Sequence, residues 1–584
     1  MFASDTPSAL FDSNLDGQRA IRLTGLVEHI RCTDPADVLA AFARIDAAGR
    51  QGHWVALAAA YELGYVFEPR LAPRRPADDT PLLEAWIFAH CDSLADAAVD
   101  AWLAEADGPA GLLDFTPAIE RAAYLEAVTR IRHYIAAGDC YQTNFTFPCR
   151  ARAYGSARAL YRQLRAAQPV RYGALIEHAH GALLSRSPEL FVERLGERLV
   201  CRPMKGTAPA AAEATALTDS AKNRAENVMI VDLIRNDLGR LVPPGHVKVT
   251  RLFEAERYRT VWQMTSTIVA HSAPAPLYDI FRALFPCGSI TGAPKVRAME
   301  IIRELERAPR GIYCGALGWI APHGDFAFNV PIRTLEIRRD GRTRCGTGSG
   351  IVFDSVPDEE WRECLLKTAF LADLPESLAL IETIRCNGGL RDPLPWLDDH
   401  LDRLCGSAAQ LGIPCDRARI EAALRASVAR LQGAHRVRLT LSIHGEPDIT
   451  CAPLGATPCR PSVILAEATV DAGDPMLRHK STARALYDRT LAAATAAGHF
   501  DALFFNTRGE LTEGCRSNVF VEVDGDLLTP ARACGLLDGV CRRRLIRAGR
   551  VRETVLTRDD LQRAQRIYVG NALRGLIEVR LATR

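Results

Sequence analysis

Carboxylates at helical spacing are the first residues in this sequence that could do chemistry. Glu226 lies at the start of a predicted helix, and Glu360 and Glu363 lie three residues apart on another, where they share one face. With a carboxylate from elsewhere, such a pair can hold Mg²⁺, which binds one or two carboxylates plus water and substrate oxygens. The alternative is a solvated helix face on which Glu363 pairs with Lys367. Spacing alone favours the solvated face.

A lysine, an arginine and a glycine run in the same part of the chain suit an anionic ligand. Lys205 lies in RPMKGT, where a tight turn could hold its amine near a ligand, although most turn lysines are simply solvated. The glycines of GTGSGIV (residues 346–352) would let backbone N–H groups approach an anion, and Arg333 could clamp a carboxylate. Neither this run nor SITGAPK (residues 289–295) has the spacing of a dinucleotide-binding motif or a P-loop.

The last third of the chain carries a second set of polar residues. Lys480 lies in RHKSTAR, Glu513 in LTEGCRSNVF and Arg403 in HLDRL, and each of these side chains is solvated by default. The segment GLLDGVCR (residues 535–542) predicts a loop that leads into the N-terminus of a helix, which is a natural phosphate site.

Length and composition limit the classes of protein to consider. The 584 residues suffice for three or four domains, or for two large ones. Lys and Arg number 72 against 70 Asp and Glu, a balance that gives no reason to expect nucleic-acid binding. No apolar run approaches the length of about 18 residues that a membrane span needs, and the first residues do not form a secretory signal. The 17 scattered cysteines, without a C-x-x-C pair, predict reduced thiols and a cytoplasmic protein.

Two domains must position these residues, because the character of the sequence changes near residue 375. A helix-like run ends there, a new strand-and-turn pattern follows, and no Gly/Ser linker separates them. We therefore expect closely docked domains at residues 1–375 and 378–584, with an α+β fold followed by a smaller α/β fold. Periodicity and turn signals predict helices at 124–135, 225–238 (mostly buried) and 397–411, and strands at 141–147, 436–443 and 518–523, the last closing on an Asp524-Gly525 hairpin.

Longer strings in the first domain carry a family resemblance. The chain resembles the chorismate-utilising enzymes through YELGY, GDCYQTNFT, SRSPELF, RPMKGT, DSAKNRAENVMIVDLIRNDLGR, CGSITGAPKVRAMEII and a final E-W-R-E-x-x-x-K, in that order. That family includes anthranilate synthase, isochorismate synthase and aminodeoxychorismate synthase component I. The resemblance implies an α+β domain of two large, mainly antiparallel sheets with the active site between them.

Within this resemblance, Lys205 points to one activity. Aminodeoxychorismate synthases of one type carry lysine in the P-x-K-G-T segment, where anthranilate and isochorismate synthases carry alanine. The implied step is attack of the Lys205 amine on C2 of chorismate as the C4 hydroxyl leaves, with Glu189 as the general acid. Ammonia then enters at C4 and expels the lysine. The amine can attack only when it is neutral, so we expect burial or a nearby cation to lower its pKa.

The resemblance also implies the ligands of this site. Glu226 and Glu363, with Glu360 nearby, match the residues that hold Mg²⁺ on the ring carboxylate. The other carboxylate would be received by Arg333, Thr291 and the backbone of Gly348, Ser349 and Gly350. Gln263 stands where the anthranilate and isochorismate enzymes carry histidine, which argues further against those two activities.

The last part of the chain resembles a second family, the fold-type IV pyridoxal-phosphate enzymes, over about residues 378–582. This family contains branched-chain and D-amino-acid aminotransferases and aminodeoxychorismate lyase. The resemblance implies that Lys480 forms the Schiff base with the cofactor and that Glu513 pairs with its pyridinium nitrogen. The cofactor phosphate would be held by Arg403, the backbone at Gly539 and Val540, and Asn571. A homodimer through this domain is expected, because fold-type IV enzymes usually dimerise.

The fusion of these two parts predicts a two-step synthesis of 4-aminobenzoate for folate. The first domain would convert chorismate to aminodeoxychorismate, and the second would release 4-aminobenzoate and pyruvate from it. The alternative keeps the first step and makes the second domain a branched-chain or D-amino-acid transaminase. None of the cysteines lies in the G-x-C-x-G elbow of a glutamine amidotransferase, so a separate glutaminase subunit is expected to supply ammonia.

Overall fold

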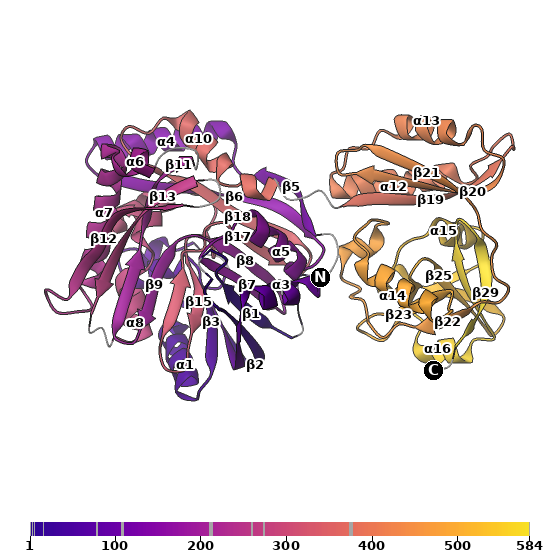
Figure 1. The fold of residues 1–584 in the computed structure, drawn as a ribbon, viewed down its shortest axis with the longest axis horizontal. Coiled ribbons are helices and arrows are strands. Elements are labelled where there is room, and N and C mark those ends of the chain that lie inside the picture. The colour runs from indigo at the N-terminus through magenta and orange to yellow at the C-terminus, as the bar shows by residue number, and fades with distance from the viewer. Residues whose placement is uncertain are drawn as a thin grey trace.

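The computed structural model shows two bodies of secondary structure that lie side by side (Figure 1). It describes residues 1–584 apart from 1, 3, 5, 16, 77–79, 107–109, 210–213, 258–260, 272–274, 373–377 and 583–584. The predicted domain boundary near residue 375 falls outside the described residues. Among the described helices, none is long and apolar enough to cross a membrane.

The strands of the first domain form one continuous antiparallel ladder. Neighbouring strands follow the order β5 (Gly111–Pro117), β6 (Gln142–Tyr154), β18 (Arg342–Ile351), β17 (Thr334–Arg338), β8 (Gly181–Ser187), β7 (Tyr172–His178), β1 (Ser8–Asp12), β2 (Ala20–Cys32), β4 (Leu83–Leu94), β3 (Trp54–Ala59), β15 (Ala316–Ile320), β16 (Phe326–Asn329), β9 (Leu190–Leu195), β10 (Arg198–Arg202), β13 (Val261–Ala270) and β12 (Val247–Arg257). The short strands β11 (Met204–Pro209) and β14 (Gly292–Ala293) pair with β13 and β6. Hydrogen bonds therefore link the two large sheets that the resemblance implied.

Helices cover this ladder and bury its apolar side chains. They are α1 (Val38–Arg50), α2 (Leu63–Phe67), α3 (Asp96–Ala104), α4 (Arg121–Ala136), α5 (Ala157–Ala167), α6 (Ala214–Thr218), α7 (Ala221–Leu238), α8 (Leu277–Leu284), α9 (Lys295–Leu305), α10 (Pro357–Leu366) and α11 (Ala369–Ala372). The largest apolar cluster packs α1, α7 and α8 against β3, β4 and β9. The helix predicted at 124–135 is confirmed as α4. The helix predicted at 225–238 is α7, which begins earlier because the Ser220 side chain caps it, and which exposes Val228 rather than being mostly buried.

The second domain consists of a small sheet with helices and a barrel-like sheet. The small sheet is β19 (Ala379–Gly388), β20 (Gly433–Ser442) and β21 (Pro447–Pro453), with α12 (Leu397–Leu411) and α13 (Arg417–Val428). The ring is β24 (Leu511–Gly514), β23 (Asp501–Phe505), β22 (Ser462–Leu465), β29 (Gly575–Leu581), β28 (Arg566–Asn571) and β25 (Asn518–Val523), and the pairing of β24 with β25 closes it. The remaining elements are β26 (Asp526–Pro530), β27 (Arg552–Thr554), α14 (Ala485–Ala496), α15 (Val540–Arg547) and α16 (Arg558–Arg563).

Four sequence predictions for this domain are confirmed. The amphipathic helix at 397–411 is α12, and the strands at 436–443 and 518–523 correspond to β20 and β25. Asp524 and Gly525 join β25 to β26 with positive φ angles of 52° and 85°, as the favoured two-residue hairpin turn requires.

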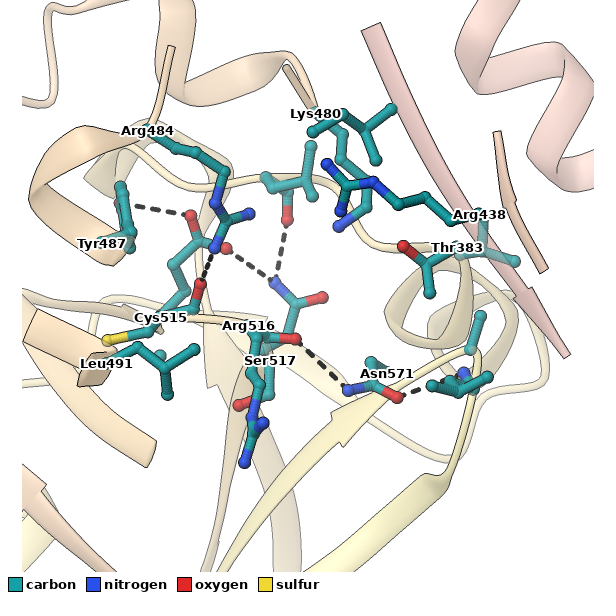
Figure 2. A pocket seen from close by; sticks show the side chains of 18 of the residues that line it. Thr383, Arg438, Lys480, Arg484, Tyr487, Leu491, Cys515, Arg516, Ser517 and Asn571 are labelled. Atoms are coloured by element: carbon teal, nitrogen blue, oxygen red, sulfur yellow. Dashed lines mark hydrogen bonds between the residues drawn. The ribbon is translucent and has the colours of Figure 1, made fainter. Parts of the chain in front are cut away.

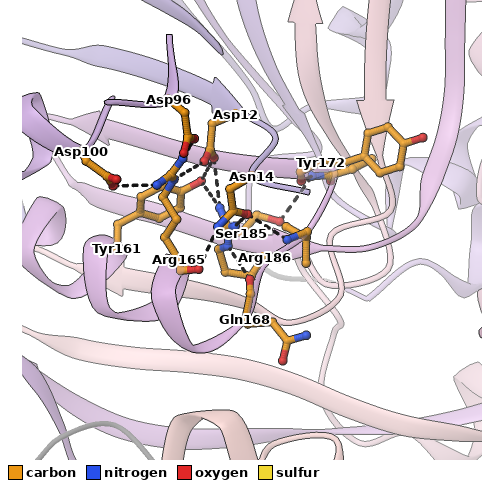
Figure 3. A network of polar contacts seen from close by, with 12 residues as sticks. Asp12, Asn14, Asp96, Asp100, Tyr161, Arg165, Gln168, Tyr172, Ser185 and Arg186 are labelled. Carbon is orange, nitrogen blue, oxygen red and sulfur yellow. Dashed lines mark hydrogen bonds and ion pairs between the residues drawn. The ribbon is translucent and has the colours of Figure 1, made fainter. Parts of the chain in front are cut away.

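A buried ion network ties the start of the chain to the middle of the first domain (Figure 3). The Asp12 carboxylate is 1% exposed and accepts hydrogen bonds from Arg186 Nη1 at 3.0 Å and Arg165 Nε at 2.7 Å. Tyr161 also donates its hydroxyl to this carboxylate. Burial raises the pKa of Asp12, but Arg186, Tyr161 and Arg165 outweigh burial and lower it below its ordinary value of 3.8.

Replacing Asp12 by Asn should destabilise the protein by about 3–5 kcal/mol, because two buried arginines lose the carboxylate between them. The free energy of unfolding in urea at pH 7 measures this. The control is Asp92→Asn in the exposed Arg22–Asp92 pair, which should cost less than about 1 kcal/mol. The advantage conferred by Asp12 is complete above its unfolded pKa and is lost as the pH falls through the lowered folded pKa. Equal costs for the two substitutions would contradict this account.

Candidate functional sites

The first site is built around Lys205, which lies in a bulged strand. The tight turn that the sequence predicts is wrong, because Gly206 adopts a left-handed conformation (φ 87°) inside β11 and shifts the register against β13. Bulges re-aim side chains, and the Lys205 Nζ donates to the backbone O of Ser289 at 2.8 Å. Burial lowers the pKa of Lys205 below its ordinary value, although the charges of Glu189 and Glu226 oppose the shift. The neutral fraction of this amine is therefore raised.

A buried acid lies beside this lysine. Glu189 follows β8 and is 4% exposed, and its Oε1 accepts a hydrogen bond from Ser289 Oγ at 2.5 Å. Burial raises the pKa of Glu189, against the opposing effects of Ser289 and Lys205. Ser289, in the 3-10 turn η3 (Gly288–Ile290), thus contacts the amine through its carbonyl and the acid through its hydroxyl. The structure brings the predicted nucleophile and the predicted general acid together.

Gly350 of β18 belongs to the same site. A Cβ atom at this position would lie 2.3 Å from Gln142 Nε2 and 3.6 Å from Lys205 Nζ, so a side chain here would displace Gln142. The neighbouring Ser349 is turned to the other face of the strand, where its Oγ lies 2.9 Å from the Tyr124 hydroxyl. A Cβ at position 350 would make only ordinary van der Waals contact with the lysine amine, so the steric conflict is with Gln142.

The predicted anion-binding backbone lies on an open strand edge. Beyond residue 345, β18 is paired only with β6. The β6 residues opposite Gly350 and Gly348 are Asn144 and Thr146, and both donate their backbone N–H groups away from β18. Gly348 and Gly350 therefore direct their own N–H and C=O groups to the free edge. Lys367 Nζ donates to Gly348 O there at 2.8 Å.

Several buried polar atoms around Lys205 have no hydrogen-bond partner within the described part of the chain. Gln142 Oε1 is one, and the others are Asn227 Nδ2, Gln263 Oε1 and Thr265 Oγ1. Gln263 and Thr265 face β11 across the bulge, and Asn227 follows the predicted ligand Glu226 in α7. Buried polar groups are seldom left unpaired in native proteins. This concentration of unpaired groups indicates a site for a polar ligand, and spacing in the sequence gave no sign of it.

Thr291 and Arg333, the other predicted carboxylate ligands, make hydrogen bonds within the protein. Thr291 is fully buried, donates its hydroxyl to Cys287 O at 2.8 Å and accepts the Asn144 N–H at 2.9 Å. Arg333 precedes β17 with a left-handed backbone (φ 51°), and its carbonyl accepts the Arg186 N–H at 3.0 Å. Their contact with a substrate stays a prediction.

The carboxylates predicted to hold Mg²⁺ do not form a cluster. Glu226 lies in α7 close enough to Lys205 to act on its charge, whereas Glu360 and Glu363 lie in α10. Glu363 Oε1 pairs with Lys367 Nζ at 2.7 Å, which is the alternative that the spacing favoured. Across the described residues, no group of three or more His, Cys, Asp or Glu side chains is placed to hold a metal ion. In this arrangement the carboxylates do not fit a metal, and its binding stays a prediction.

A buried arginine positions the first site, and sequence analysis missed it. Arg310 is 3% exposed and forms an ion pair with Glu306, Nη2 to Oε1, at 2.7 Å. The same guanidinium donates to Ile290 O at 3.0 Å and to Asn144 O at 2.6 Å. It therefore fixes the turn that carries Ser289 relative to β6. The only sequence signal was its i,i+4 spacing from Glu306, which is equally typical of solvated helix ends.

The second site is a cavity of about 570 Å³ that Lys480 enters (Figure 2). Lys480 follows the 3-10 turn η4 (Pro475–Arg478) and precedes α14. Burial lowers its pKa to about 8, assisted by the nearby charges of Arg403 and Arg484 and opposed by Glu382 and Glu513. A lysine with this pKa is about 10–20% neutral at pH 7.0–7.4, whereas one with the ordinary pKa is about 0.1% neutral at most.

Glu513 lies in β24 on the wall of the same cavity and is 7% exposed. Its side-chain donors are distant, with the Tyr487 hydroxyl at 3.3 Å and Asn518 Nδ2 at 3.4 Å. Burial raises the pKa of Glu513 to about 8, although a backbone hydrogen bond from Leu537 opposes it. A buried acid with weak partners suits a cationic group of a ligand, such as a protonated ring nitrogen.

Arg403 is held at the cavity by an ion pair that the sequence did not reveal. Glu382 in β19 accepts Arg403 Nε at 2.8 Å and Nη2 at 2.6 Å, and its Oε2 lies 2.6 Å from His400 Nδ1. Burial raises the pKa of Glu382, but Arg403 and His400 lower it to about 2. This ion pair holds Arg403 in the lining of the cavity. Nothing in the spacing of these residues distinguishes them from solvated charges.

The remaining predicted cofactor ligands lie on or beside the wall of this cavity. Gly539 precedes α15, and a Cβ there would lie 2.1 Å from Asn518 Oδ1, so only glycine leaves room for this turn. Val540 begins α15, where free N–H groups suit a phosphate. The Asn571 side chain holds its own turn by accepting the Leu573 N–H at 3.1 Å. Taken together, the lysine, the weakly paired acid, the anchored arginine and the helix N-terminus fit pyridoxal phosphate.

Comparison with known proteins assigns the two halves to separate families. Residues 7–373 match the model described as chorismate binding enzyme, and residues 379–582 match class IV amino-transferases. Aminodeoxychorismate synthase component 1 of Klebsiella aerogenes is 40% identical over 294 residues, which are 48% of this chain and 64% of that protein. The protein of the same name from Escherichia coli K12 is 41% identical over 259 residues, 43% of this chain and 57% of its own length.

Other similar proteins carry a different name. Anthranilate synthase component 1 of Streptomyces coelicolor is 40% identical over 271 residues, 44% of this chain and 52% of that protein. The crystal structure of anthranilate synthase component I from Streptococcus pneumoniae superposes with a TM-score of 0.53 at 24% identity, covering 62% of this chain and 93% of that one. It supports the fold of the first domain. The chain thus spans less than two thirds of the length of these three curated relatives.

We expect two lysines to titrate at unusually low pH in the cofactor-free protein. The chain holds only six lysines, so labelling with [ε-¹³C]lysine gives six resonances that single substitutions can assign. Lys480 should titrate near pH 8, and Lys205 below its ordinary value of 10.5, because burial favours both neutral amines. The urea-unfolded chain supplies the reference. Either lysine titrating at the same pH folded and unfolded would contradict the burial argument.

Proposed function

The chain belongs to the family of chorismate binding enzymes, and from this premise we propose that it makes 4-aminobenzoate from chorismate in two steps, one in each domain. Family membership alone does not select the first reaction, because relatives with two different names match at about equal identity. Lys205 supports the amination of chorismate to aminodeoxychorismate. An amine at this position gives the site a nucleophile of its own.

The observation that carries this proposal is the arrangement of Lys205 and Glu189 on the two polar groups of Ser289. Lys205 would attack C2 of chorismate as a neutral amine, and protonated Glu189 would donate its proton to the hydroxyl leaving C4. Ammonia then bonds to C4 and expels the lysine nitrogen from C2. The lowered pKa of the lysine and the raised pKa of the acid both favour the protonation states that this step needs. No step is assigned to a metal.

The second step takes place in the cavity at Lys480. When bound there, pyridoxal phosphate supplies an electron sink for the carbon that bears the substrate amine. Glu513 would keep the ring nitrogen protonated, and Arg403 with the α15 N-terminus would hold the phosphate. Lys480 would remove the C4 proton of aminodeoxychorismate and return a proton to the departing enol carbon, which becomes pyruvate. The ring that remains is 4-aminobenzoate.

The charge of the second cavity favours aminodeoxychorismate over a branched-chain amino acid as the substrate. Its lining includes six arginines besides Lys480, against the acids Glu513 and Asp488. The cofactor phosphate would neutralise only part of this positive charge. Aminodeoxychorismate brings two carboxylates, whereas a branched-chain amino acid brings one and an apolar side chain that gains nothing from arginines.

The proposal includes partners that lie outside this chain. Ammonia would come from a separate glutamine amidotransferase subunit, in agreement with the words "component 1" in the names of two relatives. A homodimer through the second domain and a cytoplasmic location complete the proposed setting.

Product analysis tests the two steps together. The purified chain with chorismate, ammonium, Mg²⁺ and pyridoxal phosphate should form 4-aminobenzoate and pyruvate in equal amounts, resolved by chromatography. Lys205→Met should abolish aminodeoxychorismate formation, yet still convert added aminodeoxychorismate. Lys480→Met should let aminodeoxychorismate accumulate, whereas the exposed Lys248→Met should behave as wild type. Full synthase activity in Lys205→Met would overturn the proposed nucleophile, and amino transfer to 2-oxoglutarate would replace the lyase by a transaminase.

Glu189→Gln should slow the first step by about 10²–10⁴-fold and change its pH dependence. Wild type needs Glu189 protonated, so its rate falls on the alkaline side, whereas glutamine cannot lose a proton. The ratio of variant to wild-type rate should therefore rise with pH above the pKa of Glu189, and taking this ratio cancels the titration of ammonia itself. Conversion of added aminodeoxychorismate is the internal control and should not change. A ratio independent of pH would remove Glu189 from the acid role.

A further inference from the structure

The segment that carries Lys480, residues 471–484, contains no regular element apart from η4. Its downstream part is attached to its own domain, since the Ile381 N–H donates to Lys480 O at 2.7 Å and the Thr482 N–H donates to Ala379 O at 2.9 Å. These bonds fix the lysine backbone on one side. The upstream part packs against its own domain through Ala472 and Leu477, and it also has contacts that come from the first domain.

An ion pair crosses between the domains at the start of this segment. Arg339, in the turn between β17 and β18, places Nη2 3.0 Å from Asp471 Oδ2. The Asp471 side chain is 10% exposed, and its Oδ1 accepts the Gly473 N–H at 2.8 Å. One carboxylate thus organises the turn that leads to η4 and binds that turn to the first domain.

Apolar packing continues the same contact. Leu113 of β5 and Tyr154 of β6 are 6% and 3% exposed, and they belong to one buried cluster with Met476 of η4. The rest of this cluster comes from the small sheet and helices of the second domain. An edge of the first domain therefore completes the core of the second at Met476, four residues before Lys480.

The first domain also contacts the helix that carries Arg403. Asp114, which has a left-handed backbone (φ 54°), lies against Gly412 at the C-terminal end of α12. A Cβ at Gly412 would come within 2.0 Å of Asp114 Oδ1, so the contact requires a glycine. The segment that carries Lys480 and the helix that carries Arg403 therefore both contact the first domain.

We propose that the docked first domain positions Lys480 and Arg403, so that the second domain binds pyridoxal phosphate at full strength only while the Arg339–Asp471 contact is made. This inference rests on the proposed role of Lys480. Ordering a segment without regular structure costs conformational entropy. The cross-domain contacts at Asp471 and Met476 offset part of that cost upstream of the lysine, together with the packing of Leu477 in its own domain. Arg339 and Asp471 act as positioning residues, because neither is placed to touch substrate or cofactor.

Charge reversal at Arg339 tests the inference in the full chain. Arg339→Glu sets two carboxylates against each other at the domain contact, and Arg342→Glu is the matched control. Arg342 lies three residues away, is 66% exposed and pairs only with Asp340 of its own turn among the residues that the structure describes. In the cofactor-free protein, Arg339→Glu should accelerate amide hydrogen exchange of residues 471–479 by at least about fivefold, and Arg342→Glu by less than twofold.

Two further readouts separate positioning from general destabilisation. The Lys480 ¹³Cε resonance should titrate closer to its ordinary pH in Arg339→Glu, whereas the Lys205 resonance in the same spectrum should not move. The dissociation constant for pyridoxal phosphate should rise at least about fivefold. A second change, Asp471→Lys, should restore it in part, because the pair re-forms with reversed charges although lysine cannot accept the Gly473 N–H.

The outcomes are distinct. If Arg339→Glu matches Arg342→Glu in hydrogen exchange and in the Lys480 titration, the inference is wrong. Equal movement of both lysine resonances would show general destabilisation and would also overturn it. If the wild-type chain binds no pyridoxal phosphate, the proposed function of the second domain fails, while exchange and titration in the cofactor-free chain still decide the inference.

Discussion

The buried Glu306–Arg310 ion pair is the constraint on which the first site depends. Arg310 donates to Ile290 O, next to Ser289, and to Asn144 O in β6. Glu306 accepts the N–H of Thr146, which also lies in β6. Asn144 and Thr146 are the residues opposite Gly350 and Gly348 of β18. Removing either partner would leave an uncompensated charge in the core, which costs far more than the pair itself contributes. The site is therefore built on a fixed frame, and the amine and the acid keep their separation without help from a ligand.

The second site also contains a buried ion pair between a glutamate and an arginine. Glu382 anchors Arg403, and burial rather than a specific partner sets the pKa of Lys480 and Glu513. The composition of the chain makes the choice of lysine informative: of 72 basic residues six are lysines, which leaves 66 arginines. Arginine stays charged at any physiological pH, so a neutral amine can come only from lysine. Two of the six lysines lie at the centres of the two sites.

Local patterns predicted the elements well, because periodicity and turn chemistry act over a few residues. The helix α12 and the Asp524-Gly525 turn follow from such signals alone. The sequence predicts a turn at Lys205, whereas the positive φ of Gly206 produces a bulge within a ladder of distant strands. Local patterns likewise give no sign that Gln142 and Gln263 carry unpaired buried groups, because distant strands form their surroundings. The site residues are predicted by the family resemblance. Their burial, their hydrogen bonds and the charges near them depend on the folded structure.

The completion of the second core by Leu113 and Tyr154 has a consequence for biosynthesis. The ribosome finishes the first domain before all the residues that cover this edge have been made, and domains generally fold in the order of their synthesis. During that interval an apolar edge of a finished domain is exposed to solvent. The nascent chain is therefore most prone to association with other chains at that stage, and the short distance in sequence to Leu378 and Leu380 limits how long the edge stays uncovered.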